Sequence, residues 1–129
     1  MNRNTYKITG FDGQSFSVPE RFAIKITQDL PLLVREFPDI EEIVLYGSCA
    51  KENTRYNSDI DIAVVFDTVS SEVRRKVLSF LSDRSTTDNP DFDANIVSSE
   101  WYKNADTVYA KAVKRGIVLY KKRGGKEIS

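Results

Sequence analysis

The segment that most constrains the fold of this chain is Asp59–Phe66, with the sequence DIDIAVVF. Its β-branched residues, and the alternation of polar and apolar residues at its start, predict a β-strand. Because side chains alternate between the two faces of a strand, Asp59 and Asp61 share one face and the two isoleucines share the other. Two like charges on one face repel each other, and a divalent cation with oxygen ligands commonly balances them. The alternative is a solvated strand face that carries two exposed acids.

The rest of the chain predicts strands and helices in mixed order. TYKIT and QSFSV flank the turn signal Asp12-Gly13 and indicate an N-terminal hairpin within residues 1–17. Apolar residues at helical spacing follow Pro19 as far as Phe37, and Pro31 either kinks one helix or separates two. The other expected elements are strands at residues 43–46, 92–97 and 117–120, and helices at about residues 70–81 and 98–115.

This order of elements predicts a single mixed sheet covered by helices, an α/β (α+β) fold. A length of 129 residues is that of one domain, spanning residues 1–129. Such a chain can bury a core without a disulfide or a metal. Residues 121–129 are polar and contain glycine, so we expect them to form a frayed tail.

The composition excludes several kinds of site. The absence of histidine removes Ser-His-Asp and Cys-His nucleophile systems and histidine-ligated zinc or haem. Cys49 is the only cysteine, so it forms no internal disulfide or thiolate zinc cage, and its lone use favours a cytoplasmic location. The 19 basic and 19 acidic residues cancel, and no apolar run is long enough to span a membrane, so neither nucleic acid nor a membrane is an expected partner.

Two further features bear on chemistry. Gly47-Ser48 follows the apolar run at residues 43–46. A glycine there permits a tight turn and lets backbone N–H groups approach an anion, and a serine hydroxyl adds a donor for a phosphate oxygen. Asp93 lies near the start of the strand predicted at residues 92–97 and is a candidate third carboxylate, with Asp91 as the rival. Alone, the Gly-Ser pair is typical of an ordinary turn. Either aspartate alone is typical of the entry to a strand.

Together these features are far more specific. The sequence YGSCAKENTRYNSDIDIAVVFD, followed by Asp93, resembles the nucleotidyltransferase superfamily of DNA polymerase beta. For so short a chain the resemblance is to the minimal nucleotidyltransferase family, many members of which are encoded as antitoxins beside a HEPN-domain toxin. It runs from about Leu33 to Tyr120 and implies a polymerase-beta-like fold.

The resemblance also implies roles for individual residues. Asp59, Asp61 and Asp93 would hold two Mg²⁺ ions, with Asp93 on the side of the acceptor hydroxyl. Four residues would bind the triphosphate of an NTP, which we expect to be ATP: Gly47, Ser48, Lys51 and Ser58. For Lys51 the alternative is a solvated loop lysine, and for Ser58 a simple turn residue.

One position departs from the family pattern. Glycine commonly follows the basic residue that Lys51 matches, and this chain has Glu52 instead. A carboxylate near a triphosphate is unfavourable unless it points away or pairs with Lys51 or Arg55. The effect of Glu52 on the loop conformation, and with it on nucleotide affinity, is therefore not determined by the sequence.

Three functions remain for such a chain. The first is a magnesium-dependent nucleotidyltransferase that moves an NMP to a hydroxyl, which in the antitoxin version is a tyrosine of a partner HEPN toxin. The second is a partner-binding module of the same fold with little or no transfer activity. The third is an aminoglycoside-type transferase, for which a homo-oligomer or a partner would have to complete the acceptor site.

Overall fold

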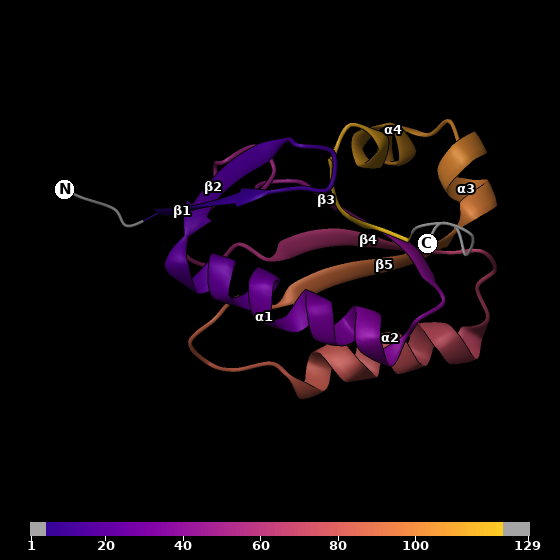
Figure 1. Ribbon diagram of the computed structural model, residues 1–129, viewed down its shortest axis with the longest axis horizontal. Helices are drawn as coiled ribbons and strands as arrows, with labels where there is room; N and C mark the ends of the chain where they lie inside the picture. The colour runs from indigo at the N-terminus through magenta and orange to yellow at the C-terminus, as the bar shows by residue number, and fades with distance from the viewer. Residues whose placement is uncertain (1–4, 123–129) are drawn as a thin grey trace, which may run out of the picture.

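The computed structural model describes residues 5–122, and its centre is a four-stranded mixed sheet (Figure 1). The strand order is β5-β4-β3-β6. β4 and β5 run parallel, whereas β3 is antiparallel to both β4 and β6. The bounds of the strands are β3 Ile40–Tyr46, β4 Ile60–Phe66, β5 Phe92–Ser98 and β6 Ile117–Lys121.

Helices cover this sheet, as predicted, and they lie on both of its faces (Figure 1). α1 (Glu20–Glu36) and α2 (Ser71–Asp83) lie on one face, and α3 (Ser99–Asn104) and α4 (Val108–Lys114) on the other (Figure 1). The larger core lies under α1 and α2 and includes Leu33, Ile62 and Val77. The smaller one joins Val113 of α4 to Val44 and Ala63 of the sheet.

A small antiparallel hairpin precedes α1 and forms its own two-stranded sheet, with β1 at Thr5–Thr9 and β2 at Ser15–Pro19. Phe16 and Val18 of β2 are buried in the larger core. At the turn, the backbone N–H of Phe11 donates to the carbonyl of Val118 at 2.7 Å. The hairpin is therefore fixed to α1 and to the edge strand β6.

Pro31 lies inside a single helix, so the chain adopts the first of the two predicted alternatives. Leu30 is 6% exposed and Leu33 is fully buried, so both sides of the proline are held against the core. Burying two leucines contributes about 3–6 kcal/mol, which offsets the cost of about 3 kcal/mol for a proline in a helix interior.

The prediction of a single helix at residues 98–115 is wrong. The structure has two helices, α3 and α4, because the chain is extended at Ala105 and restarts at Thr107. The Thr107 hydroxyl accepts a hydrogen bond from the backbone N–H of Ala110 at 3.0 Å, which caps the second helix.

Two strand boundaries also differ from the expectation. β3 begins at Ile40, three residues before the predicted start at residue 43, because Ile40 is buried and pairs with Phe66. Lys121 belongs to β6 instead of the expected tail, and residues 123–129 of that tail lie outside the described part of the chain.

A buried ionic cluster joins α1 to the end of α2. The Lys25 ammonium lies 2.6 Å from Asp29 Oδ2, without hydrogen-bond alignment, and both side chains are 5% exposed. Arg84 Nε donates to Asp29 Oδ1 at 3.1 Å, and its carbonyl accepts from Lys25. Among residues 5–122, no helix is long and apolar enough to cross a membrane.

Candidate active site

Strand register brings two of the predicted carboxylates into one row. Tyr46 pairs with Asp61 across β3 and β4, and Asp61 pairs with Asp93 across β4 and β5. Cross-strand partners point to the same face of a sheet. That face is the one under α3 and α4, because Val44 and Ala63, two residues along from this row, pack against α4.

The pKa of Asp61 reflects both its burial and the two neighbouring carboxylates. Burial raises the pKa of its carboxyl to about 6, and the charges of Asp93 and Asp59 add to the effect. Asp59 itself is exposed and lies just before β4. The three side chains therefore share one negative field at the start of β4, as the sequence predicts.

The rival aspartate, Asp91, is engaged elsewhere. Its carboxylate accepts a hydrogen bond from the Ser85 hydroxyl at 2.6 Å, and its carbonyl accepts from the backbone N–H of Ile60. It therefore anchors the entry to β5, while Asp93 lies in the row with Asp61.

The donor set of this row fits magnesium. Mg²⁺ takes carboxylate oxygens and keeps several waters, so it does not require an all-protein cage. No group of three acidic, histidine or cysteine side chains within residues 5–122 is already closed around a point as such a cage. Burial, with the charges of Asp93 and Asp59 adding to it, raises the pKa of Asp61, and a divalent cation would compensate the negative charge gathered here.

Gly47 is required at the turn beside Asp61. Its φ is +77°, in the region that favours glycine, and a Cβ at this position would overlap Asp61 Oδ2. The following loop is closed by backbone hydrogen bonds from Lys51 to Gly47 at 3.1 Å and from Asn53 to Ser48 at 3.0 Å. Ser48 is half-buried at the start of this loop, directly after Gly47.

The structure does not place the other two predicted phosphate-binding residues against the carboxylates. Lys51 is exposed on the loop. The Ser58 hydroxyl accepts a hydrogen bond from the backbone N–H of Arg55 at 2.8 Å, which makes it a turn residue in this structure. Its own hydroxyl proton is not used by that bond.

Glu52 lies in the same loop and bonds to the hairpin. Its φ is +60°, in the left-handed region that favours the glycine of the family pattern. Its carboxylate accepts a hydrogen bond from the backbone N–H of Ser17 at 2.7 Å. It therefore pairs with β2 and with neither Lys51 nor Arg55, the partners considered from the sequence.

Sequence reasoning missed a polar and aromatic group beside the carboxylates. Asn95, two residues after Asp93, donates from Nδ2 to the Tyr46 hydroxyl at 2.9 Å. The Tyr46 and Tyr109 hydroxyls lie 2.7 Å apart, and the Tyr109 ring packs on Trp101. Burial raises the pKa of both tyrosines. The period-two spacing of Asn95 from Asp93 was a usable signal, whereas Tyr109 depends on the restart of the helix.

Cys49 is part of this loop, and its side chain is fully buried. Burial raises the pKa of its thiol to about 12, and the charge of Asp61 adds to the shift. A protonated, enclosed thiol is a packing residue.

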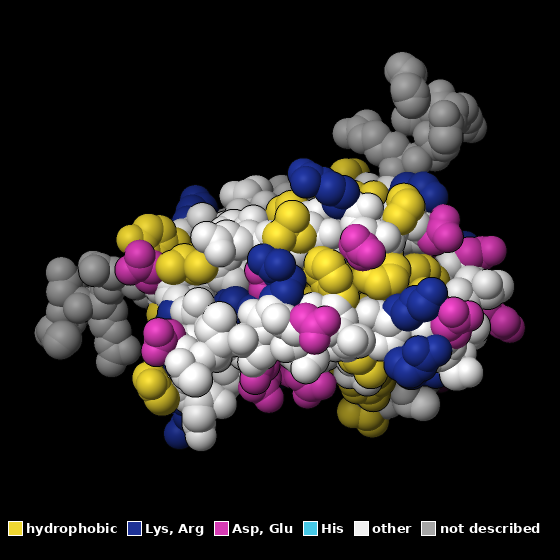
Figure 2. Space-filling view, turned by 90° about the horizontal axis from the view of Figure 1, so that it is seen from below, with side chains coloured by type: hydrophobic (Ala, Val, Ile, Leu, Met, Phe, Trp, Pro, Cys, Tyr) yellow, Lys and Arg dark blue, Asp and Glu magenta, His cyan; other side chains and the backbone are white. Residues whose placement is uncertain are grey.

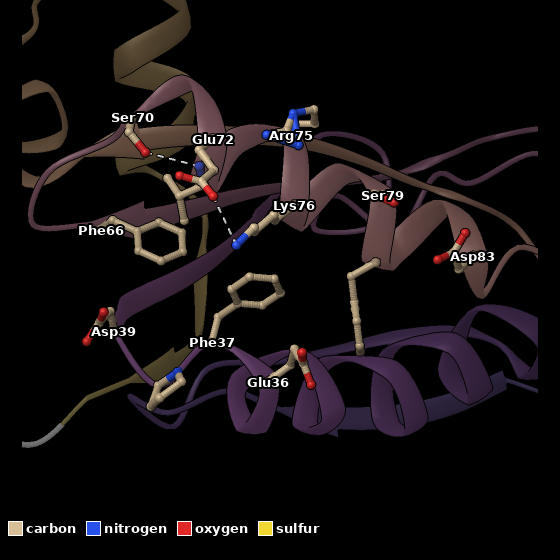
Figure 3. Close-up of a pocket in the computed structure, with 13 residues that line it drawn as sticks. Glu36, Phe37, Asp39, Phe66, Ser70, Glu72, Arg75, Lys76, Ser79 and Asp83 are labelled. Atoms are coloured by element: carbon tan, nitrogen blue, oxygen red, sulfur yellow. Dashed lines mark hydrogen bonds and ion pairs between the residues drawn. The ribbon is translucent and has the colours of Figure 1, made fainter.

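A separate groove of about 830 Å³ lies between the end of α1 and α2 (Figure 3). Phe37 and Phe80 meet edge-to-face in it, and Lys76 pairs with Glu72 at 3.1 Å. It is lined at the sheet by Phe66, the last residue of β4, whereas Asp61 lies near the first. On the side of the molecule formed by α1 and α2, acidic and basic side chains are interspersed (Figure 2).

Comparison with known proteins agrees with this fold. Residues 28–124 match the family described as polymerase beta, nucleotidyltransferase. A structure described as a nucleotidyltransferase from Sulfolobus solfataricus shares 21% identity and a TM-score of 0.56, covering 79% of this chain and 82% of that one. No curated protein matches the sequence significantly.

Two further similar structures are toxin–antitoxin complexes. One, solved with AMP-PNP, is 29% identical with a TM-score of 0.51 and covers 73% of this chain and 72% of that one. The other, a mutant of the pair MntA-HpeT, is 26% identical with a TM-score of 0.49 and covers 73% and 71%.

A mixed sheet with helices on both faces and a row of aspartates beside a glycine turn defines a nucleotidyltransferase domain. The family match covers most of the chain, and the chain belongs to the polymerase beta nucleotidyltransferase family.

Proposed function

We propose that this protein transfers AMP from ATP to a hydroxyl group with the help of Mg²⁺. The observation that carries the proposal is the row formed by Asp61 and Asp93, with Asp59 and the Gly47 turn beside it. Carboxylates that repel one another next to a loop able to accept an anion suit a magnesium-bound triphosphate.

In this proposal, different residues serve the nucleotide and the acceptor. Asp59 and Asp61 would hold ions on the nucleotide side, and Asp93 would hold an ion on the acceptor side. When bound, two ions supply charge stabilisation at the transferred phosphoryl group. Asp93 accepts the proton of the acceptor hydroxyl, while Gly47 and Ser48 bind the phosphates that leave as pyrophosphate.

Lys51 and Ser58 would complete the triphosphate contacts. Lys51 is exposed and free to turn toward an anion, where it acts as a point charge. Ser58 can donate its hydroxyl proton while it accepts from Arg55. Catalysis of phosphoryl transfer is mainly positioning and electrostatics, so a site without histidine is sufficient.

For the acceptor, we propose a tyrosine of a HEPN-domain toxin, so that the protein acts as an antitoxin in the cytoplasm. The support is the likeness to a toxin–antitoxin complex that was solved with AMP-PNP. Residues 1–129 act as one domain in this proposal, and the toxin or a second copy of the chain completes the acceptor side.

The test is mass spectrometry of the co-expressed partner after incubation with ATP and Mg²⁺. We expect an adduct of AMP mass on the partner with the unmodified chain and none with Asp61→Asn. Asp67→Asn, an exposed aspartate at the opposite end of β4, is the matched control and should retain transfer. Partner binding without an adduct from any of the four NTPs would instead support the binding module.

A further inference from the structure

The N-terminal hairpin lies outside the family match, which begins at residue 28, yet it contacts the loop of the candidate site. We call residues 47–58 the phosphate loop. Two residues near the start of the chain hold this loop, Ser17 in β2 and Arg21 in the first turn of α1. Because Phe16, Val18 and Phe22 are buried, both holding points belong to one fixed unit.

The first holding point uses the free edge of β2. The backbone N–H of Gly10 donates to the Gln14 carbonyl at 2.6 Å, so this pair marks a hydrogen-bonded position at the turn. Hydrogen-bonded pairs alternate along an antiparallel ladder. Ser17, paired with Lys7, is consequently in a non-hydrogen-bonded pair, and its N–H points outward to the Glu52 carboxylate at 2.7 Å.

Glu52 lies where backbone hydrogen bonds close the turn and where its side chain reaches β2. A φ of +60° is unfavourable for a residue with a Cβ. Backbone hydrogen bonds from Glu52 to the Cys49 carbonyl at 3.2 Å and from Asn53 to the Ser48 carbonyl at 3.0 Å form the pattern of a Schellman motif, which places Glu52 in this left-handed conformation. The hydrogen bond from Ser17 then fixes the Glu52 carboxylate to β2, and it is a charge-assisted bond of the stronger kind.

The second holding point is at the other end of the loop. The Arg21 guanidinium donates to the Tyr56 carbonyl and stacks on the Tyr56 ring, 4.4 Å from its centroid. Tyr56 is otherwise 83% exposed. The phosphate loop is thus attached to the hairpin at Glu52 and to the start of α1 at Tyr56.

We propose that Glu52 is a positioning residue for nucleotide binding, which clamps the phosphate loop to β2 through Ser17. The clamp fixes the loop that begins at Gly47, and it directs the negative charge of Glu52 toward a backbone N–H and away from the phosphates. The role in nucleotide binding rests on the proposed function, whereas the clamp itself can be measured without nucleotide.

Three variants separate the clamp from the charge. Glu52→Gly removes the acceptor and relieves the unfavourable φ, and Ser17→Pro removes the donor N–H at an edge position that tolerates proline. Glu52→Gln is the matched control, because it removes the charge and keeps an acceptor oxygen. Each is measured for AMP-PNP affinity with Mg²⁺ by calorimetry, for melting temperature, and for amide hydrogen exchange in residues 47–58.

We expect Glu52→Gly and Ser17→Pro to bind AMP-PNP about tenfold more weakly, the effect of losing one strong hydrogen bond that preorganises the loop. Glu52→Gln should stay within about threefold. Amide exchange in the loop should accelerate in the first two variants only, while Glu52→Gly keeps its melting temperature because the strain is gone. A purely structural role would lower the melting temperature and leave affinity unchanged.

Unchanged loop exchange and unchanged affinity in Glu52→Gly would overturn the clamp and leave the proposed function intact. Faster exchange in a chain that binds no nucleotide even before substitution would establish the clamp as a loop contact. That second result would overturn both its role in nucleotide binding and the proposed function.

Discussion

Replacing Asp61 with asparagine should abolish transfer and at the same time stabilise the fold in the absence of metal. The ionised side chain is partly buried beside two other carboxylates, and both effects disfavour its charge. Asparagine keeps the shape and removes the charge. A loss of activity together with a gain in stability identifies a residue whose charge serves a bound cation.

The size of the gain follows from the pKa of Asp61, which rises from 3.8 to about 6. A shift of about two units corresponds to about 3 kcal/mol for a fully buried group. Asp61 is only partly buried, so solvent screening reduces the expected gain to about 1–2 kcal/mol. For a domain of this size, the melting temperature should rise by about 3–8 °C.

The dependence on pH gives the sign of the effect. The folded state holds the Asp61 proton more tightly than the unfolded state, so the unsubstituted chain loses this stability as pH rises from 3.8 through about 6. The difference between Asp61→Asn and the unsubstituted chain should therefore be small at pH 4 and largest above pH 7.

The assay is thermal unfolding in a chelator at pH 4 and pH 7.5, with Asp67→Asn as the control. Asp67 is an exposed aspartate just after β4, so its replacement should leave the melting temperature within about 1 °C at both pH values. An Asp61→Asn variant that is no more stable than the unsubstituted chain at pH 7.5 would refute the reasoning.

Three other predictions concern the fold. Asp29→Asn leaves the buried Lys25 ammonium without its ionic partner, so guanidinium unfolding should show a loss of about 3 kcal/mol, and a loss below about 1 kcal/mol would contradict the cluster. Thr107→Ala removes the hydroxyl that accepts a hydrogen bond from the Ala110 backbone N–H and should cost about 1 kcal/mol by thermal unfolding, with an unchanged melting temperature arguing against the cap. Cys49, with a pKa of about 12, should resist alkylation at pH 8 until the chain is unfolded, and rapid labelling of the native protein would contradict its burial.

Much of the site could be predicted because its signals are local. The alternation in DIDI places Asp61 on one face of a strand, and Gly47-Ser48 ends a neighbouring strand. The family pattern then added Asp93, which spacing alone left open against Asp91. Register in the sheet is what joins Asp61 to Asp93, and register is fixed by the buried faces of β4 and β5.

The parts that could not be predicted depend on tertiary contacts. The hydrogen bond between Ser17 and Glu52 joins residues 35 positions apart, and no periodicity connects them. The break between α3 and α4 had a local signal in Thr107, but an apolar pattern at helical spacing hid it. The proximity of Tyr109 to Tyr46 depends on that break, so it could not be predicted without it.

The measurement that tests the central claim most directly is a crystal structure with Mn²⁺ and AMP-PNP, using the anomalous signal of manganese. The account predicts manganese bound by Asp61 and Asp93, with the triphosphate against Gly47 and Ser48. Nucleotide bound elsewhere, for instance in the groove between α1 and α2, with no metal at Asp61, would contradict it.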